Sequence, residues 1–132
     1  MLKIKRKKIL VVDDDSDFLF QISNALQEME FEVITAKNQI ETENIIDKVR
    51  PDLAIIDLIM ENQDTGFILC HFIKRKYPDL PVIIASAVTA VTGMMFDLNS
   101  DPNQQWIKAD LFLDKGFRKD QLHKEINKLL KI

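Results

Sequence analysis

Five short runs of apolar residues recur along the chain, and longer stretches with a different apolar spacing separate them. The runs are rich in Ile, Val and Leu; they are Ile9–Val12, Val33–Ala36, Leu53–Ile56, Val82–Ala85 and Leu111–Leu113. Short runs of this kind are typical of strands that are buried on both faces of a parallel sheet. We therefore predict five strands.

Between the runs, apolar residues recur three or four positions apart, as on one face of a helix. These stripes are Phe18, Ile22, Leu26 and Met29; Ile45, Ile46 and Val49; Phe67, Ile68, Cys70, Phe72 and Ile73; and Leu122, Ile126, Leu129 and Leu130. The first stripe follows the cap candidates Asp15 and Ser16, and prolines limit the second and third. Residues 88–109 have weak periodicity, and we expect at most one short helix there.

The alternation of strands and helices predicts an α/β fold, in which right-handed crossovers place helices on both faces of a parallel sheet. The chain has 132 residues, which fits one domain with a substantial core. We therefore expect residues 1–132 to form a single domain.

Composition narrows the class of protein. Apolar residues make up 46% of the chain and charged residues 30%, and the net charge of −3 gives no electrostatic reason to expect nucleic-acid binding. The basic start "MLKIKRKK" precedes only four apolar residues, too few for a signal peptide or a membrane span. One cysteine, Cys70, excludes an internal disulfide and favours the cytoplasm.

Polar side chains gather where the predicted strands end. Asp13 and Asp14 follow the first strand, Asp57 the third, Ser86 the fourth and Lys115 the fifth. Ligands of open α/β sheets bind beyond the carboxyl ends of the strands, so these side chains are candidates for a common site.

Three carboxylates at one edge repel one another, at a cost of about 4 kcal/mol for a pair of charges 4 Å apart at an effective dielectric near 20. Capping the first helix needs only one of the aspartates, so capping does not explain the cluster. Mg²⁺ prefers oxygen ligands and commonly joins one or two carboxylates to a phosphate. We therefore predict a Mg²⁺ site.

Four segments, "KILVVDDDSDF", "PDLAIIDLIM", "PVIIASA" and "ADLFLDKGF", resemble the successive motifs of the response-regulator receiver domain of two-component signalling. The resemblance covers nearly the whole chain. It implies a flavodoxin-like three-layer sandwich, with a doubly wound five-stranded parallel sheet of order 2-1-3-4-5 and five helices.

The resemblance also implies roles for individual residues. Asp57 corresponds to the aspartate that accepts a phosphoryl group. Asp13 and Asp14 correspond to the acidic pair that binds Mg²⁺ together with Asp57 and the backbone carbonyl of Ile59. The phosphodonor would be a histidine kinase or a phosphotransfer protein.

Three further positions complete the implied signalling machinery. Ser86 corresponds to the hydroxyl residue that binds a phosphoryl oxygen, Lys115 to the lysine that pairs with the phosphoryl group, and Phe112 to an aromatic residue that turns inward on activation. The domain would switch conformation and bind an effector protein, as a monomer or weak dimer, without turning over an external substrate. Taken singly, each residue also has a structural alternative: a helix cap for Asp14 or Asp15, a solvated acid at the start of a loop for Asp57, a cap or turn residue for Ser86, a surface position for Lys115, and a core position for Phe112.

The chain departs from the family pattern at three places. Gly116 follows Lys115 where the family usually has proline, so we expect a trans peptide bond there. The loop before Gly66 has one extra residue, and the segment between Ser86 and Lys115 is longer than usual.

Two alternative functions remain open. A haloacid-dehalogenase-like phosphatase would use Asp13 as nucleophile in a D-x-D pattern with Asp15, although the chain is short and the characteristic threonine and glycine are missing. A degenerate receiver would bind partners without phosphorylation; Gly116 encourages this reading, and the three aspartates argue against it.

Overall fold

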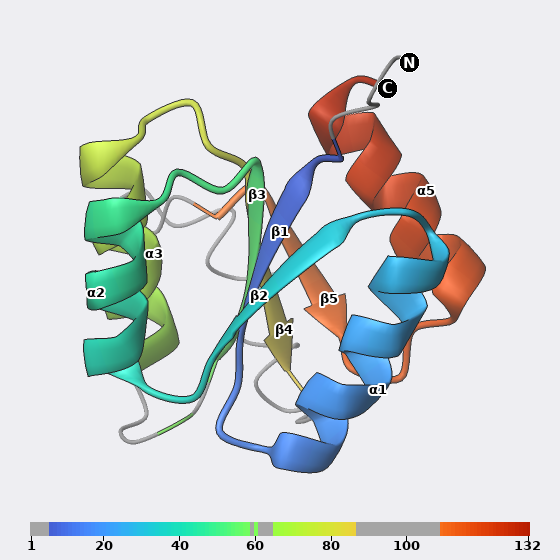
Figure 1. Ribbon diagram of the computed structural model, residues 1–132, viewed down its shortest axis with the longest axis horizontal. Helices are drawn as coiled ribbons and strands as arrows, with labels where there is room; N and C mark the ends of the chain where they lie inside the picture. Colours follow the sequence, from blue (N-terminus) through green and yellow to red (C-terminus); the bar gives the residue numbers. More distant parts are fainter. Residues whose placement is uncertain (1–5, 59, 61–64, 87–108) are drawn as a thin grey trace, which may run out of the picture.

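The computed structural model describes residues 6–58, 60, 65–86 and 109–132. Its centre is a parallel sheet of five strands, shown in Figure 1. The strands are β1 (Lys8–Val12), β2 (Glu32–Ala36), β3 (Leu53–Asp57), β4 (Val82–Ser86) and β5 (Leu111–Asp114). Each strand contains its predicted apolar run and extends it by at most one residue at either end.

The strand order is β2-β1-β3-β4-β5, and all four neighbouring pairs are parallel. This is the predicted doubly wound order. The order reverses direction at β1, which lies between β2 and β3, so the loops after β1 and β3 leave the sheet toward opposite faces. Such a switch point opens a crevice at the carboxyl edge of the sheet.

Four helices of the described residues cover the sheet: α1 (Ser16–Glu28), α2 (Gln39–Lys48), α3 (Thr65–Lys76) and α5 (Lys119–Leu130). Figure 1 shows α1 and α5 on one face and α2 and α3 on the other, which makes the predicted three-layer sandwich. Within these residues, no helix combines the length and apolarity needed to cross a membrane. Of residues 88–109, where at most one short helix was expected, the structure describes only Ala109.

Two apolar cores form because successive residues of a strand point to opposite faces. The core under α1 and α5 includes Ile9, Val11, Leu26, Ile55 and Ile126. The core under α2 and α3 includes Leu10, Val12, Ile46, Ile56 and Ile73. Each of these side chains is at least 99% buried, and full burial of one such side chain contributes about 1.5–3 kcal/mol.

The edge strands are less buried than the central three. Val33 and Ile34 of β2 are half-buried, as are Leu111 and Leu113 of β5. An edge strand has a neighbour on one side only and is covered less completely by helices. Burial on both faces, predicted for all five strands, therefore holds fully for β1, β3 and β4 alone.

Helix α1 begins where a side chain satisfies its first backbone N–H groups. Asp15 is the N-cap, and its carboxylate accepts hydrogen bonds from the N–H groups of Asp17 and Phe18. Asp15 thus has the capping role that was open for Asp14 or Asp15. Asp14 remains available at the edge of the sheet.

Candidate functional site

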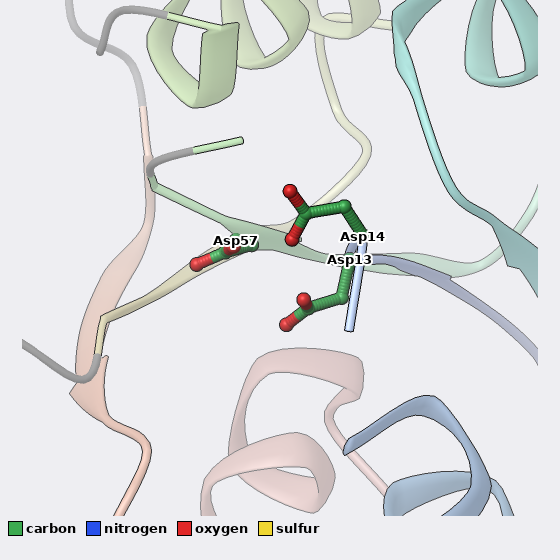
Figure 2. Close-up of side chains that lie close together, drawn as sticks. All are labelled: Asp13, Asp14 and Asp57. Carbon is green, nitrogen blue, oxygen red and sulfur yellow. The ribbon is translucent and has the colours of Figure 1, made fainter. Parts of the chain in front are cut away.

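Three carboxylates meet at the carboxyl edge of the sheet. Asp13 directly follows β1 and is fully buried, Asp57 ends β3 and is 7% exposed, and Asp14 is exposed. One carboxylate oxygen from each of the three lies within 4.8 Å of the other two. Figure 2 shows the three side chains extending from the ends of these neighbouring strands. The structure thus brings together the three aspartates singled out from the sequence.

The two oxygens of Asp13 have different surroundings. Oδ1 accepts a hydrogen bond from the Asp15 N–H at 2.9 Å. Oδ2 lies 2.7 Å from the Lys115 ammonium nitrogen, but it accepts no hydrogen bond of good geometry from the described residues. This fully buried oxygen thus has one ion-pair partner but no hydrogen bond of good geometry, and a bound cation would further offset its charge.

Lys115 lies between two of the carboxylates. Its Nζ is 2.7 Å from Asp13 Oδ2 and 3.2 Å from Asp57 Oδ1, and its side chain is 16% exposed. Its backbone N–H donates to the carbonyl of Ser86 at 2.8 Å, which ties the loop after β5 to the end of β4. One ammonium offsets one of three negative charges, so the cluster keeps a net charge of −2 when all four groups are ionised.

These surroundings alter the acidity of two groups. Burial, together with the negative charge of Asp13, raises the pKa of Asp57 from 3.8 to about 6, although Lys115 opposes the rise. Burial alone would lower the pKa of Lys115, but the Asp13 and Asp57 carboxylates outweigh it and the pKa is raised. Asp57 therefore titrates close to neutral pH, while Lys115 stays charged.

An aromatic residue completes the surroundings of Lys115. The Lys115 Nζ lies 4.6 Å from the centroid of the Phe18 ring, within the range of a cation–π contact. The Phe18 ring packs edge to face with Phe117, with centroids 6.4 Å apart. The sequence assigned Phe18 only to the apolar stripe of a helix. The only feature of the sequence that placed Phe18 near the site was its position in the first helical turn after the aspartates.

Ser86 and Phe112 lie on neighbouring strands. Ser86 is buried at the end of β4, one residue beyond Ala85, which is aligned with Asp57. Phe112 is half-buried and packs against the core under α2 and α3. The carbonyl of Ile59, a predicted metal ligand, lies outside the described residues.

The two glycines near the site have different surroundings. The predicted trans bond before Gly116 is confirmed, since the described residues contain no cis peptide bond. The Gly116 N–H donates to Asp114 Oδ1 at 2.7 Å, a bond that a proline could not make. Gly66 packs so closely that an added Cβ would lie 2.6 Å from the carbonyl oxygen of Asp57.

The donor set suits a hard divalent cation. Asp13, Asp14 and Asp57 supply carboxylate oxygens, which Mg²⁺ and Ca²⁺ prefer over nitrogen or sulfur ligands. The excess negative charge and the poorly solvated Asp13 Oδ2 both favour a cation at this position. The described residues can therefore hold a metal ion.

Comparison with known proteins identifies the family. The model of the response regulator receiver domain matches residues 9–127. The chain belongs to the response regulator receiver domain family. This membership agrees with the resemblance read from the four motifs and favours a receiver over the phosphatase alternative.

Curated relatives match the chain over nearly its full length. The heme response regulator HssR of Staphylococcus aureus is 33% identical over 123 residues, which are 92% of this chain and 50% of that protein. The probable transcriptional regulator ycf27 of Cyanophora paradoxa is 30% identical over 98% of this chain and 51% of that protein. The receiver chain thus spans about half the length of these relatives.

Solved receiver structures have the same architecture. The Francisella response regulator 1452 receiver domain is 28% identical with a TM-score of 0.77, and covers 96% of this chain and 98% of its own. The response regulator TrrA of Thermotoga maritima, solved in complex with Mg²⁺ and BeF, is 29% identical with a TM-score of 0.76, covering 93% and 98%. Receiver domains accept phosphoryl groups from histidine kinases and signal to effectors, so this chain is a signalling domain of two-component systems.

Proposed function

We propose that this receiver accepts a phosphoryl group on Asp57, in a reaction that requires Mg²⁺, and then signals to a partner protein. The observation that carries the proposal is the convergence of Asp13, Asp14, Asp57 and Lys115 at the switch point of the sheet. Family membership supports it, because phosphorylation on aspartate is typical of receivers.

The surroundings favour Asp57 over Asp13 as the nucleophile. Asp13 is fully buried, with Oδ1 hydrogen-bonded to the Asp15 N–H and Oδ2 in an ion pair with Lys115. Asp57 ends a strand, is slightly exposed and contacts Lys115 through Oδ1. With a pKa of about 6, Asp57 is largely ionised at neutral pH and can act as a nucleophile.

The transfer is a substitution at phosphorus. An oxygen of Asp57 forms a bond to the phosphorus atom as the bond from phosphorus to the donor breaks, and the donor's leaving atom takes the electron pair. If the donor is a phosphohistidine, the leaving atom is an imidazole nitrogen. The product is an acyl phosphate on Asp57 and a free histidine on the kinase or phosphotransfer protein.

The remaining residues of the site would stabilise the charge on the transferring group. Asp13, Asp14 and Asp57, with the proposed carbonyl of Ile59, would hold Mg²⁺, which when bound neutralises negative charge on the phosphoryl oxygens. The ammonium of Lys115 would contact a phosphoryl oxygen in place of Asp57, and the hydroxyl of Ser86 would donate to another. The similar response regulator TrrA was solved in complex with Mg²⁺ and BeF, which supports a role for Mg²⁺ in a receiver of this kind.

Signalling would follow from movement of Ser86 and Phe112. Phe112 lies on β5, three residues before Lys115, and Ser86 accepts a hydrogen bond from Lys115 through its carbonyl. A phosphoryl group that recruits Ser86 and Lys115 would therefore shift the ends of β4 and β5, to which Phe112 belongs. We propose that residues 1–132 do this as one domain, in the cytoplasm, as a monomer or weak dimer.

Intact-mass analysis tests the proposal. The wild type, Asp57→Asn and Asp13→Asn are incubated with acetyl phosphate and Mg²⁺, with and without EDTA. We expect one phosphoryl group on the wild type, none on Asp57→Asn and none in EDTA. A phosphoryl group that survives Asp57→Asn but is lost in Asp13→Asn would support the phosphatase-like alternative. No gain on the wild type would indicate a receiver that works without phosphorylation.

A further inference from the structure

The backbone around Lys115 does not by itself determine where the ammonium of this lysine lies. Lys115 has a flexible stem of four carbons, and Gly116 restricts the local backbone less than any other residue would. Yet its ammonium lies within 3.2 Å of two carboxylates, with most of the side chain buried. Holding a long side chain in one geometry costs conformational entropy, so other contacts must favour that geometry.

Backbone hydrogen bonds hold the loop around Lys115. The Lys115 N–H donates to the Ser86 carbonyl at 2.8 Å, and the Phe117 N–H donates to the Asp114 carbonyl at 3.1 Å. The Gly116 N–H donates to the Asp114 side chain. These bonds place the Cα of Lys115, but they leave the four rotatable bonds of its stem free.

The ring of Phe18 contacts the ammonium of Lys115. It lies 4.6 Å from Nζ on the side of α1, while Asp13 and Asp57 lie on the side of the sheet edge. Phe18 is itself held at two points. Its N–H donates to the capping carboxylate of Asp15, and its ring packs against Phe117 with an interplanar angle of 70°.

A cavity beside Lys115 offers an alternative position for the lysine side chain. The space is about 180 Å³ and is lined by Phe18, Ile22, Lys115, Phe117, Lys119 and Leu122, among others. It lies between α1 and α5, away from the carboxylates. Without the Phe18 ring, this cavity would be larger, and the Lys115 side chain would have room to turn into it.

We propose that Phe18, supported by Phe117, is a positioning residue that keeps the ammonium of Lys115 directed between Asp13 and Asp57. The part of this proposal that concerns phosphoryl transfer rests on the proposed function of Asp57. Gly116 does not restrain the Lys115 side chain. The contact with Phe18, a residue of α1, restrains it instead. A cation–π contact with a largely desolvated ammonium is strong enough to decide between two side-chain positions.

Three variants separate this role from ordinary packing. Phe18→Leu removes the ring but keeps an apolar side chain of similar length, and Phe18→Tyr keeps the ring. Phe20→Leu makes the same change on the same helix at a side chain that is 70% exposed. Thermal unfolding of each variant checks that it is folded, and Phe117→Leu, which removes the supporting ring, replaces Phe18→Leu if the latter fails to fold.

The first readout is the NMR signal of Lys115 in the protein without Mg²⁺ or phosphodonor. Protons beside the face of an aromatic ring are shifted upfield, so the Hε protons of Lys115 are expected upfield of ordinary lysine values. The shift should persist in Phe18→Tyr and Phe20→Leu and be lost in Phe18→Leu. Equal Lys115 shifts in the wild type and Phe18→Leu would overturn the proposal.

The second readout is the rate of Asp57 phosphorylation by acetyl phosphate at saturating Mg²⁺. A small donor avoids any effect of α1 on docking of a kinase. Phe18→Leu is expected to react about threefold to tenfold more slowly, whereas Phe18→Tyr and Phe20→Leu stay within about twofold of the wild type. An unchanged rate in Phe18→Leu would refute the positioning role. Failure of the wild type to react would contradict the proposed function, and the NMR readout would then decide the contact between Phe18 and Lys115.

Discussion

The carboxylate of Asp57 is buried, and the negative charge of Asp13 repels it. Both effects favour the protonated carboxyl group, and together they raise its pKa to about 6 against the pull of Lys115. A carboxyl group with a raised pKa in the folded state stabilises the fold less as the pH rises from its unfolded to its folded pKa. Asp57, the proposed acceptor, thus destabilises the metal-free domain at neutral pH.

Replacing Asp57 with Asn should reveal this cost. In the absence of Mg²⁺, the free energy of unfolding of Asp57→Asn relative to the wild type should increase between about pH 4 and pH 6.5 and level off above. The rise in pKa from 3.8 to about 6 corresponds to a gain of about 3 kcal/mol at the plateau. Urea unfolding at several pH values measures this difference in the free energy of unfolding. Asp79→Asn, at an exposed position, is the control. A difference that stays constant across this range would refute the argument.

The start of α3 packs against the backbone of Asp57 and Leu58. The Gly66 N–H donates to the carbonyl of Leu58 at 3.2 Å, so α3 begins in direct contact with the backbone just past β3. A Cβ at position 66 would lie 2.6 Å from the Asp57 carbonyl oxygen and 2.7 Å from Leu58 Cα. Backbone atoms cannot move aside as a flexible side chain can, so the absence of a side chain here is a packing requirement.

A pair of glycine substitutions tests this requirement. Gly66→Ala should destabilise the domain by about 1–3 kcal/mol, because α3 must move away from the end of β3. Gly116→Ala should change stability by less than about 1 kcal/mol, because its Cβ would meet only the Asp114 side chain, at 3.2 Å. Thermal unfolding of the two variants compares them directly. Equal stability of Gly66→Ala and the wild type would contradict the close packing.

The elements and the carboxylates could be predicted because both depend on local pattern. Each strand lies within one residue of its apolar run, and a sheet edge brings together whatever follows its strands, which located Asp13 and Asp57. The contact between Phe18 and Lys115 could not be predicted. It depends on how α1 is rotated and how the loop after β5 packs on it, and no periodicity in the sequence encodes either.

Across the whole molecule, the site connects the two helical layers. Asp13 and Asp14 lie between β1 and α1, and Asp57 ends β3, which α3 follows along the chain. Figure 1 shows α1 and α3 on opposite faces of the sheet. Ser86 and Phe112 belong to β4 and β5, beyond β3. A ligand bound at these strand ends would therefore lie beside the loops that lead to both helical layers.

Beryllofluoride, a mimic of the phosphoryl group, should show this connection. Adding it with Mg²⁺ is expected to change NMR chemical shifts around Asp57 and also at Ser86 and Phe112. A ligand moves such an equilibrium only through contacts that differ between the two states, and a swing from 1:99 to 99:1 needs about 5.5 kcal/mol. The spectra of Lys115→Ala, which loses one of those contacts, should show a smaller change at Phe112. Shifts confined to the loops after β1 and β3 would indicate a receiver that binds the mimic without switching.

Mg²⁺ should stabilise the whole fold, because its three proposed carboxylate ligands are brought together only when β1 and β3 are paired. A ligand that binds only the folded state stabilises it by about 2.7 kcal/mol at a hundred times its dissociation constant. For a domain of this size, that gain raises Tm by roughly 8–13 °C. The ion pairs of the cluster also predict how the Tm values of the aspartate variants should rank. Asp14→Asn removes repulsion and leaves the pair of Lys115 with Asp13 intact, so its Tm without Mg²⁺ should rise above that of the wild type while its response to Mg²⁺ shrinks.

The Asp13→Asn variant separates ion pairing from metal binding. It also removes one carboxylate, but it breaks the 2.7 Å contact with Lys115, so its Tm without Mg²⁺ should fall below that of Asp14→Asn. The variant that carries both Asp13→Asn and Asp14→Asn should show no increase in Tm when Mg²⁺ is added. NaCl at matched ionic strength controls for screening, which would stabilise a repulsive cluster without specific binding. If NaCl raises the wild-type Tm as much as MgCl₂ does, or if the double variant responds like the wild type, the aspartates are not the metal ligands.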